Sequence, residues 1–248
     1  MKKHILVFLA FNNVEQIKKS FESMYQTDID FFIIENKSKY SEEISNFFIE
    51  QKKIRDNIVG YIQFEKNIAA NAVNVCVRDY VTLFKNYEYF TYTDGDYYVF
   101  DMKSTVDEIL SAFKNPNCAI SSVELYPFSN WRQHGNRILG TDHYIEYMNK
   151  RNNITPNSVI GIGVPSLMTL QNKDLNIIEN IYFLDGNIRN RLSELGKQWY
   201  ITTKYLSYHL TDECCYDEVR GDEYMTWKRS IGNMIWRITD ESNYLILI

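Results

Sequence analysis

The sequence lacks the features of several specialised classes of protein. No part of its 248 residues approaches the roughly 20 consecutive apolar residues of a membrane-spanning helix. A charged leader, an apolar core and a small-residue cleavage site are missing from the start, so we expect no secretory signal. Internal repeats and low-complexity tracts are also absent, which argues against a repeat architecture.

Cysteine is scarce, and its four positions do not form a recognisable site. Cys76 and Cys118 stand alone, while Cys214 and Cys215 are adjacent, so no pair has the spacing of a zinc site. Adjacent cysteines also make a poor disulfide in a chain of this size. We therefore expect reduced thiols and a cytoplasmic protein.

A strong excess of charge of either sign is missing as well. The chain has 27 basic and 32 acidic residues, a formal net charge of −5, and no long basic block. A nucleic-acid partner is therefore not expected. Any phosphate group must be bound locally, and we expect a metal ion to take part.

The composition that remains is that of an ordinary globular protein. Hydrophobic residues make up 45% of the chain and charged residues 24%. One α/β domain with a short appendage fits the length better than two full domains.

Apolar runs of strand length alternate with segments of helical periodicity in the first part of the chain. The expected strands are 4–11, 29–34 and 58–64, and the helices between them are 14–25 and 42–53. This β-α-β-α-β order implies a parallel sheet with right-handed crossovers. Ligands collect at the carboxyl ends of the strands in such sheets, so residues that follow each strand are candidates for a site.

The same kind of pattern continues to about residue 210. The elements expected there are, in order, a helix at 69–84, a strand at 87–93, a helix at 104–113 with Ser104 as its N-cap, a strand at 118–125, a surface loop at 128–139, an apolar stretch at 159–170, a helix at 187–195 ended by Gly196, and a last strand at 199–203. Residues from about 211 form a separate C-terminal segment.

Asp94-Gly95-Asp96, at the end of an expected strand, is the strongest chemical feature. Two carboxylates separated by one residue can face the same hard cation and a bound diphosphate. Gly95 lets the backbone turn between them. The alternative is a tight Asp-Gly turn whose acids are simply solvated.

Five short motifs recur in one order along the chain. They are Phe11-Asn12-Asn13 with Ser23-Met24-Tyr25-Gln26-Thr27; Ile33-Ile34-Glu35-Asn36-Lys37-Ser38; Asn67-Ile68-Ala69 with Asn74; Asp94-Gly95-Asp96; and Leu184-Asp185-Gly186-Asn187-Ile188 with Arg191-Leu192-Ser193-Glu194-Leu195-Gly196. Over roughly residues 4 to 210 this order resembles the GT-A glycosyltransferases, nearest to the inverting enzymes of family 2. The departures from the family's usual residues are Glu35, Ala69, Leu184 and Asn187.

The resemblance implies a GT-A fold, which is a Rossmann-like α/β fold with a mostly parallel central sheet flanked by helices. Residues 1–210 would form the catalytic domain, with a nucleotide-sugar half of about 1–100 and an acceptor half of about 101–210. Residues 211–248 would be a short helical extension.

The resemblance also implies a donor site for a nucleotide sugar, with UDP favoured. Its residues would be Phe11, Asn12, Glu35, Asn36, Asn67, Asn74, Asp94, Gly95 and Asp96. Mn²⁺ or Mg²⁺ held by Asp94, Asp96 and His209 would stabilise the leaving diphosphate. Asp185 would be the general base that takes the proton of the acceptor hydroxyl in an inverting transfer.

Each of these residues also has an ordinary structural interpretation. Asp185 can cap the helix that follows it. Glu35 and Asn36 can close a strand-to-helix turn. His209, beside two tyrosines in sequence, can be a packed or surface histidine.

Two further segments are candidates for contact with an acceptor or a membrane. The acceptor candidates are Trp131, Arg132, His134 and Gly163, with Trp131 able to stack on a sugar. In the tail, apolar side chains fall near one helical face, namely Tyr224, Trp227, Ile231, Met234, Ile235 and Ile238. That face can lie at a membrane surface or pack against the catalytic domain.

The ordered motifs favour transfer of a sugar from a nucleotide donor to a glycan or lipid-linked acceptor. A phosphohydrolase is a weaker alternative, because its nucleophile would follow the first strand and not the fourth. A protein that binds nucleotide sugars or glycans without catalysis is a third, because Leu184 and Asn187 replace acids of the family's pattern.

Overall fold

The computed structural model describes residues 2–68, 71–126, 166–179, 185–210 and 243–248. The acceptor candidates Trp131, Arg132, His134 and Gly163 lie outside these residues, as do Leu184 and the apolar face expected at 224–238.

The described strands form one sheet in the order β5-β8-β6-β7-β4-β1-β2-β3-β9. Their bounds are β1 Lys2–Ala10, β2 Asp30–Glu35, β3 Ile58–Phe64, β4 Tyr87–Asp94, β5 Tyr97–Val99, β6 Cys118–Tyr126, β7 Ser166–Gln171, β8 Gln198–His209 and β9 Tyr244–Ile246. The strands β1, β2, β3, β4, β6 and β8 run in one direction, and β5, β7 and β9 run against them. The expected α/β fold with a mostly parallel central sheet is confirmed.

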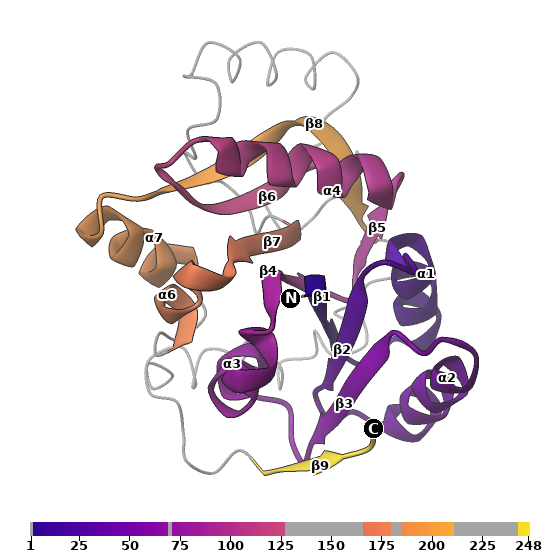
Figure 1. The fold of residues 1–248 in the computed structure, drawn as a ribbon. Helices are drawn as coiled ribbons and strands as arrows, with labels where there is room; N and C mark the ends of the chain where they lie inside the picture. Colours follow the sequence, from indigo (N-terminus) through magenta and orange to yellow (C-terminus); the bar gives the residue numbers. More distant parts are fainter. Residues whose placement is uncertain (1, 69–70, 127–165, 180–184, 211–242) are drawn as a thin grey trace, which may run out of the picture.

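Helices cover both faces of this sheet (Figure 1). Their bounds are α1 Val14–Met24, α2 Ser41–Ile54, α3 Asn71–Phe84, α4 Met102–Ser111, α6 Asn176–Glu179 and α7 Asp185–Glu194, with short 3₁₀ turns η1 Ala112–Lys114 and η3 Asn172–Asp174. Apolar residues at helical spacing, such as Ile17, Phe21 and Met24 of α1, supply the buried stripes. The buried residues of α1, α2 and α4 belong to one core, and those of α3, α6 and α7 belong to the other.

Helix α4 begins earlier than its sequence pattern predicts, and the prediction of Ser104 as its N-cap is wrong. Asp101 is the N-cap, because its side chain accepts a hydrogen bond from the backbone N–H of Ser104 at 3.0 Å. The Ser104 hydroxyl donates to the same carboxylate at 2.8 Å. Asp and Ser are both good caps, and the folded backbone uses the Asp that comes three residues earlier.

Strands β8 and β9 differ from the elements expected in the second half of the chain. Strand β8 continues to His209, so this histidine is the last residue of the strand and does not follow it. Strand β9 pairs antiparallel with β3, with Ile62 opposite Ile246, so the last residues join the sheet at the edge of the N-terminal half. We expected these residues to belong to a separate extension.

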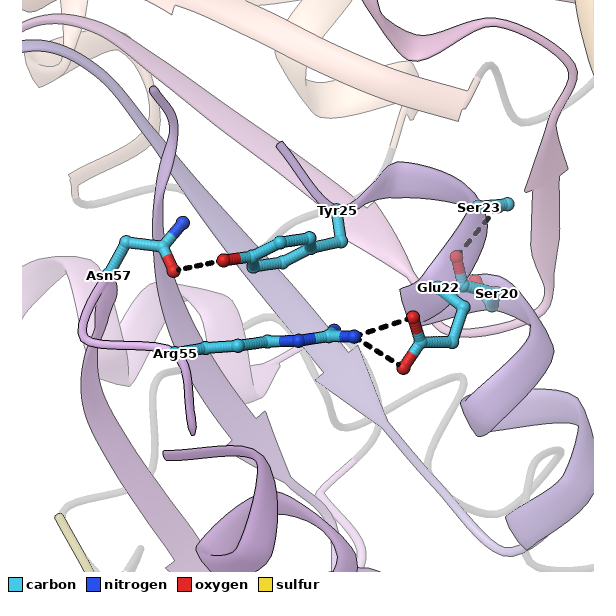
Figure 2. A network of polar contacts seen from close by, with 6 residues as sticks. All are labelled: Ser20, Glu22, Ser23, Tyr25, Arg55 and Asn57. Atoms are coloured by element: carbon cyan, nitrogen blue, oxygen red, sulfur yellow. Dashed lines mark hydrogen bonds and ion pairs between the residues drawn. The ribbon is translucent and has the colours of Figure 1, made fainter. Parts of the chain in front are cut away.

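A polar cluster joins α1, α2 and β3 at the amino-terminal edge of the sheet (Figure 2). The Arg55 guanidinium donates to both carboxylate oxygens of Glu22, at 2.9 and 2.7 Å, and its central carbon lies 4.0 Å from the centroid of the Tyr25 ring. The Tyr25 hydroxyl donates to Asn57 at 3.0 Å, and the Asn57 amide donates to the backbone carbonyl of Ile29 at 2.6 Å. This polar cluster lies at the edge of the sheet opposite the strand ends that carry the candidate site.

Candidate functional site

The carboxyl ends of four parallel strands meet at one edge of the sheet. Leu9 of β1 lies opposite Asp94 of β4, Ala10 lies opposite Glu35 of β2, and Glu35 lies opposite Gln63 of β3. The register therefore brings Asp94 and Glu35, two predicted site residues from distant motifs, into neighbouring rows at this edge.

The side chains of Asp94 and Glu35 leave the sheet on opposite faces. Phe31 and Ile33 of β2 lie in the core with α1 and α2, while Phe90 and Tyr92 of β4 lie in the core with α3. Because side chains alternate along a strand, Glu35 lies on the face of α1 and α2, and Asp94 lies on the face of α3. The edge thus has two polar environments, one on each side of the sheet.

The turn between β1 and α1 is held in a conformation that few residues adopt. Asn12 has a φ of 67°, in the left-handed region, where asparagine is tolerated, and its side chain is buried. Asn13 then caps α1, since its side chain accepts from the backbone N–H of Gln16 at 3.0 Å. Phe11, which precedes the turn, is half-buried. Phe11 and Asn12 are therefore fixed at the strand end where the prediction places them.

Asn36 links the ends of three strands. Its backbone N–H donates to the carbonyl of Ala10 at 3.1 Å, and its side-chain oxygen accepts from the backbone N–H of Ile68 at 3.1 Å. Asn67, next to Ile68, is half-buried. Asn36 and Asn67 thus lie at one corner of the edge, although Asn36 itself is buried.

Glu35 is fully buried beneath α2 and is held by two donors. One carboxylate oxygen accepts hydrogen bonds from the Tyr61 hydroxyl and from the Gln63 amide, the latter at 3.0 Å. Tyr61 and Gln63 both bond to the Ser45 hydroxyl of α2, at 3.2 and 2.8 Å. The other oxygen of Glu35 has no hydrogen-bond partner among the described residues.

Burial determines the ionisation of this group. Desolvation raises the pKa of Glu35, although the polar side chains of Ser41, Tyr61 and Gln63 act in the opposite direction. Desolvation together with the Glu35 carboxyl also raises the pKa of Tyr61. Burial therefore favours the neutral form of Glu35 more than water does, and the residue has no exposed surface in this structure.

The turn at Asp94-Gly95-Asp96 is pressed against β1. The Gly95 N–H donates to the carbonyl oxygen of Leu9 at 2.7 Å, and a Cβ at position 95 would lie 2.8 Å from that oxygen. The glycine is thus required by this close approach and not by a left-handed φ. Tyr92 lies on the same face of β4 as Asp94, and its hydroxyl donates to one carboxylate oxygen of Asp94.

The end of β8 lies beside this turn. His209 is paired with Tyr97 of β5, and the backbone N–H of Leu210 donates to the carbonyl of Asp96 at 2.7 Å. The backbone of the predicted histidine ligand is therefore paired with the residue that follows Asp96. The side chain of His209 lies outside what the structure describes.

The residue types at this turn fit Mn²⁺ or Mg²⁺, because hard cations bind carboxylate oxygens and imidazole suits transition metals. Within the described side chains no group of three or more His, Cys, Asp or Glu residues could hold a metal ion. The ligand set Asp94, Asp96 and His209 stays a prediction.

Asn74 and Asp185 lie on the α3 face. Asn74 is fully buried, and its amide donates to the carbonyl of Ile178 in α6 at 3.1 Å, so the contact seen here joins two helices. Asp185 is the first residue of α7, which packs into the core of that face through Ile188 and Leu192. The side chain of Asp185 lies outside the described residues, and its role as a base stays a prediction.

Several polar residues of this edge were missed by the sequence analysis. Tyr61 and Gln63 bind Glu35, Tyr92 binds Asp94, and Gln16 contacts the end of β8. A signal exists only for Gln16, which stands three residues after the cap Asn13. The others depend on strand register, which is a tertiary property.

The remaining predictions concern the thiols and a membrane. Cys76 and Cys118 are free and buried, and burial raises the pKa of Cys118 to about 12. In the part of the chain that the structure describes, no helix has the length and apolar character to cross a bilayer.

Comparisons with known proteins give one sequence relative and a shared fold. No family model matches the chain. An uncharacterized protein of Acanthamoeba polyphaga mimivirus, L142, is 27% identical over 223 residues, which are 82% of this chain and 42% of that protein. The chain thus spans less than half the length of this relative.

Among solved structures, a CMP:2-keto-3-deoxy-manno-octonic acid synthetase in complex with CTP has a TM-score of 0.51 and 9% identity, covering 91% of this chain and 99% of that one. A197 from STIV has a TM-score of 0.47 and 11% identity, covering 85% and 87%. The bifunctional glycosyltransferase WbbM has a TM-score of 0.40 and 14% identity, covering 81% and 38%. The first of these shows the same α/β fold, and the other two scores are too low to add to it.

Proposed function

We propose that this chain is a metal-dependent glycosyltransferase that uses a nucleotide-sugar donor at the carboxyl edge of its sheet. The observation that carries the proposal is the arrangement around Asp94-Gly95-Asp96. Backbone contacts to Leu9 and Leu210 hold this turn between β1 and the end of β8, beside the backbone of His209. Carboxylates so placed are suited to a cation and a diphosphate.

The metal would be held by Asp94, Asp96 and His209. When bound, Mn²⁺ or Mg²⁺ supplies Lewis-acid stabilisation of the negative charge that grows on a leaving diphosphate. The chain's own part is to fix the two carboxylates. The Tyr92 hydroxyl orients Asp94, and the Gly95 contact sets the backbone between the two acids.

Donor recognition is assigned to the loops beside this turn. Phe11 and Asn12 follow β1, Asn36 follows β2, and Asn67 lies in the segment after β3. Of the residues predicted to bind the donor, Glu35 and Asn74 are fully buried. We therefore assign them mainly a structural role, which is to support these loops and helices. UDP sugars are the donors we favour, and the identity of the donor is the first thing to determine.

The transfer step needs one base on the acceptor side. Asp185, at the start of α7 on the face of Asp94, would take the proton of the acceptor hydroxyl as its oxygen attacks the anomeric carbon. The bond to the nucleotide breaks in the same step, with inversion. The acceptor would be a glycan or a lipid-linked sugar that contacts Trp131, Arg132, His134 and Gly163.

A second candidate is nucleotidyl transfer, which the similarity to a synthetase bound to CTP favours. In that reaction a sugar oxygen attacks the α-phosphorus of the nucleoside triphosphate, and pyrophosphate leaves. The same carboxylate turn could hold the cation in either reaction, so the two functions must be distinguished by their products.

One experiment separates these functions. UDP-, GDP-, dTDP- and CMP-sugars are incubated with the chain and Mn²⁺, and release of the nucleotide is measured. In parallel, CTP and UTP with free sugars are assayed for pyrophosphate, and a generic phosphomonoester is assayed for hydrolysis. Nucleotide release from one donor supports the proposal, and pyrophosphate release alone supports the second candidate. Binding of nucleotide sugars without any turnover would indicate a non-catalytic binder.

A further inference from the structure

Gln16 is a buried polar side chain that joins the start of α1 to the far end of the chain. It is only 2% exposed, and its amide nitrogen donates to the backbone carbonyl of Leu210 at 2.6 Å. Leu210 directly follows His209, the last residue of β8. Burying an amide is unfavourable unless it is hydrogen-bonded, so this contact accounts for a polar residue at this position.

Leu210 is in turn bonded to the carboxylate turn. Its backbone N–H donates to the carbonyl of Asp96 at 2.7 Å, while the N–H of Gly95 donates to Leu9 at 2.7 Å. The turn is therefore held from one side by β1 and from the other by residue 210. Gln16 in turn holds Leu210 in place by donating to its carbonyl.

The backbone of Gln16 also contacts the turn between β1 and α1. Its N–H donates to the side chain of Asn13, the N-cap of α1, at 3.0 Å. Phe11 and Asn12 come immediately before this cap. Gln16 thus connects three segments that converge at the edge of the sheet, namely 11–13, 94–96 and 209–210.

We infer that Gln16 is a positioning residue for the metal and diphosphate site, an inference that rests on the proposed function. Its hydrogen bond holds Leu210 against the start of α1. Because Leu210 follows His209 and bonds to Asp96, this contact also sets where the backbones of these two residues lie. Groups that orient metal ligands through a hydrogen bond affect metal affinity although they do not touch the ion. Gln16 acts one step further out, because its partner Leu210 follows the predicted ligand His209 and donates to the backbone of Asp96.

The test compares Gln16→Met, Ser20→Ala and the wild type. Methionine keeps the length and packing of the side chain but cannot donate to Leu210. Ser20 lies one turn further along the same buried face of α1, and its hydroxyl has no partner within the described residues, which makes it a matched control. Free Mn²⁺ is measured by electron paramagnetic resonance with UDP, CDP or GDP present, and melting temperatures are recorded without metal.

We expect Gln16→Met to weaken nucleotide-dependent Mn²⁺ binding by about 10-fold, as for other groups that orient metal ligands. Ser20→Ala should bind Mn²⁺ as the wild type does and melt at or above the wild-type temperature. If Gln16→Met does not fold, Gln16→Asn replaces it, because the shorter side chain keeps the amide but cannot reach Leu210.

Equal Mn²⁺ affinity in a folded Gln16 variant and in the wild type overturns the role of Gln16 and leaves the proposed function standing. Absence of nucleotide-dependent Mn²⁺ binding in the wild type overturns the metal-dependent function, and the role of Gln16 with it. Asp96→Ala, measured alongside, shows how completely binding is lost when a predicted ligand is removed.

Discussion

At the residue scale, the carboxyl group of Glu35 is bound by Tyr61 and Gln63 in a place that solvent does not reach. Desolvation raises its pKa, so the neutral form is easier to populate here than in an exposed glutamate. A glutamine at this position offers an acceptor to both donors and puts an amide where the second oxygen lies. An alanine leaves two buried donors without this partner.

We therefore predict that Glu35→Gln keeps the stability of the wild type, while Glu35→Ala loses about 2 kcal/mol or more of unfolding free energy. Because the folded-state pKa of Glu35 lies above its ordinary value of 4.5, the wild type should lose stability relative to Glu35→Gln as pH rises above 4.5. Urea unfolding of the three proteins at several pH values measures both effects. Equal losses in Glu35→Gln and Glu35→Ala would show that the group is ionised.

The sequence identified Glu35 and Asp94 as polar residues at strand ends, and the register confirms that they lie at the same edge, in neighbouring rows. It did not show that they lie on opposite faces of the sheet. Alternation within a strand relates neighbours to one another, but which face α1, α2 or α3 covers depends on how the helices cross over. The assignment of Glu35 to direct nucleotide contact came from motif order and remains untested.

Asp185 carries the prediction that separates catalysis from helix capping. Asp185→Asn keeps the size and most of the capping ability of the residue but cannot accept a proton. We predict that turnover falls by about 100-fold or more, in line with the loss of a general base, while donor binding and melting temperature stay near wild type. Steady-state kinetics with the accepted donor, together with thermal melts, measure this. Retained turnover, or loss of turnover only together with the fold, would identify Asp185 as a helix cap.

At the element scale, β9 completes the sheet beside β3. The backbone N–H of Leu247 donates to the carbonyl of Tyr61 at 2.8 Å, and the Tyr244 ring lies 5.5 Å from the ring of Phe64. The Tyr244 hydroxyl donates to Asp79 of α3 at 3.1 Å. These contacts hold the chain end on the strand that also carries Tyr61, the partner of Glu35.

We predict that deletion of residues 244–248 lowers the melting temperature by roughly 4 °C or more, since each kcal/mol lost corresponds to about 2–4 °C in a domain of this size. Leu245→Ser is the control, because Leu245 is 54% exposed and should contribute little. Differential scanning calorimetry of the three proteins decides. An unchanged melting temperature after the deletion would mean that β9 is not part of the stable sheet.

The elements show where sequence patterns suffice. The strand Ile58–Phe64 has its predicted bounds, because a compact apolar run ends in polar residues on both sides. Strand β8 is far longer than the apolar segment that indicated it, and β9 was not recognised as a strand. Both owe their hydrogen bonds to partners distant in sequence, which local periodicity does not report.

At the scale of the whole molecule, the polar cluster of Figure 2 and the candidate site lie at opposite edges of the sheet. The cluster around Arg55 joins helices and strands at the amino-terminal edge, while the carboxylate turn, the end of β8 and the capped start of α1 converge at the opposite edge. The CMP:2-keto-3-deoxy-manno-octonic acid synthetase shares the fold at 9% identity, so chemistry must be argued from this edge and not from the fold.

The measurement that tests the proposed function most directly is nucleotide release from the accepted sugar donor with and without metal. We predict that excess chelator abolishes release, that Mn²⁺ or Mg²⁺ restores it, and that Asp96→Ala loses both metal and nucleotide affinity while its melting temperature is preserved. Full nucleotide release in excess chelator would contradict the metal-dependent function assigned to Asp94, Asp96 and His209.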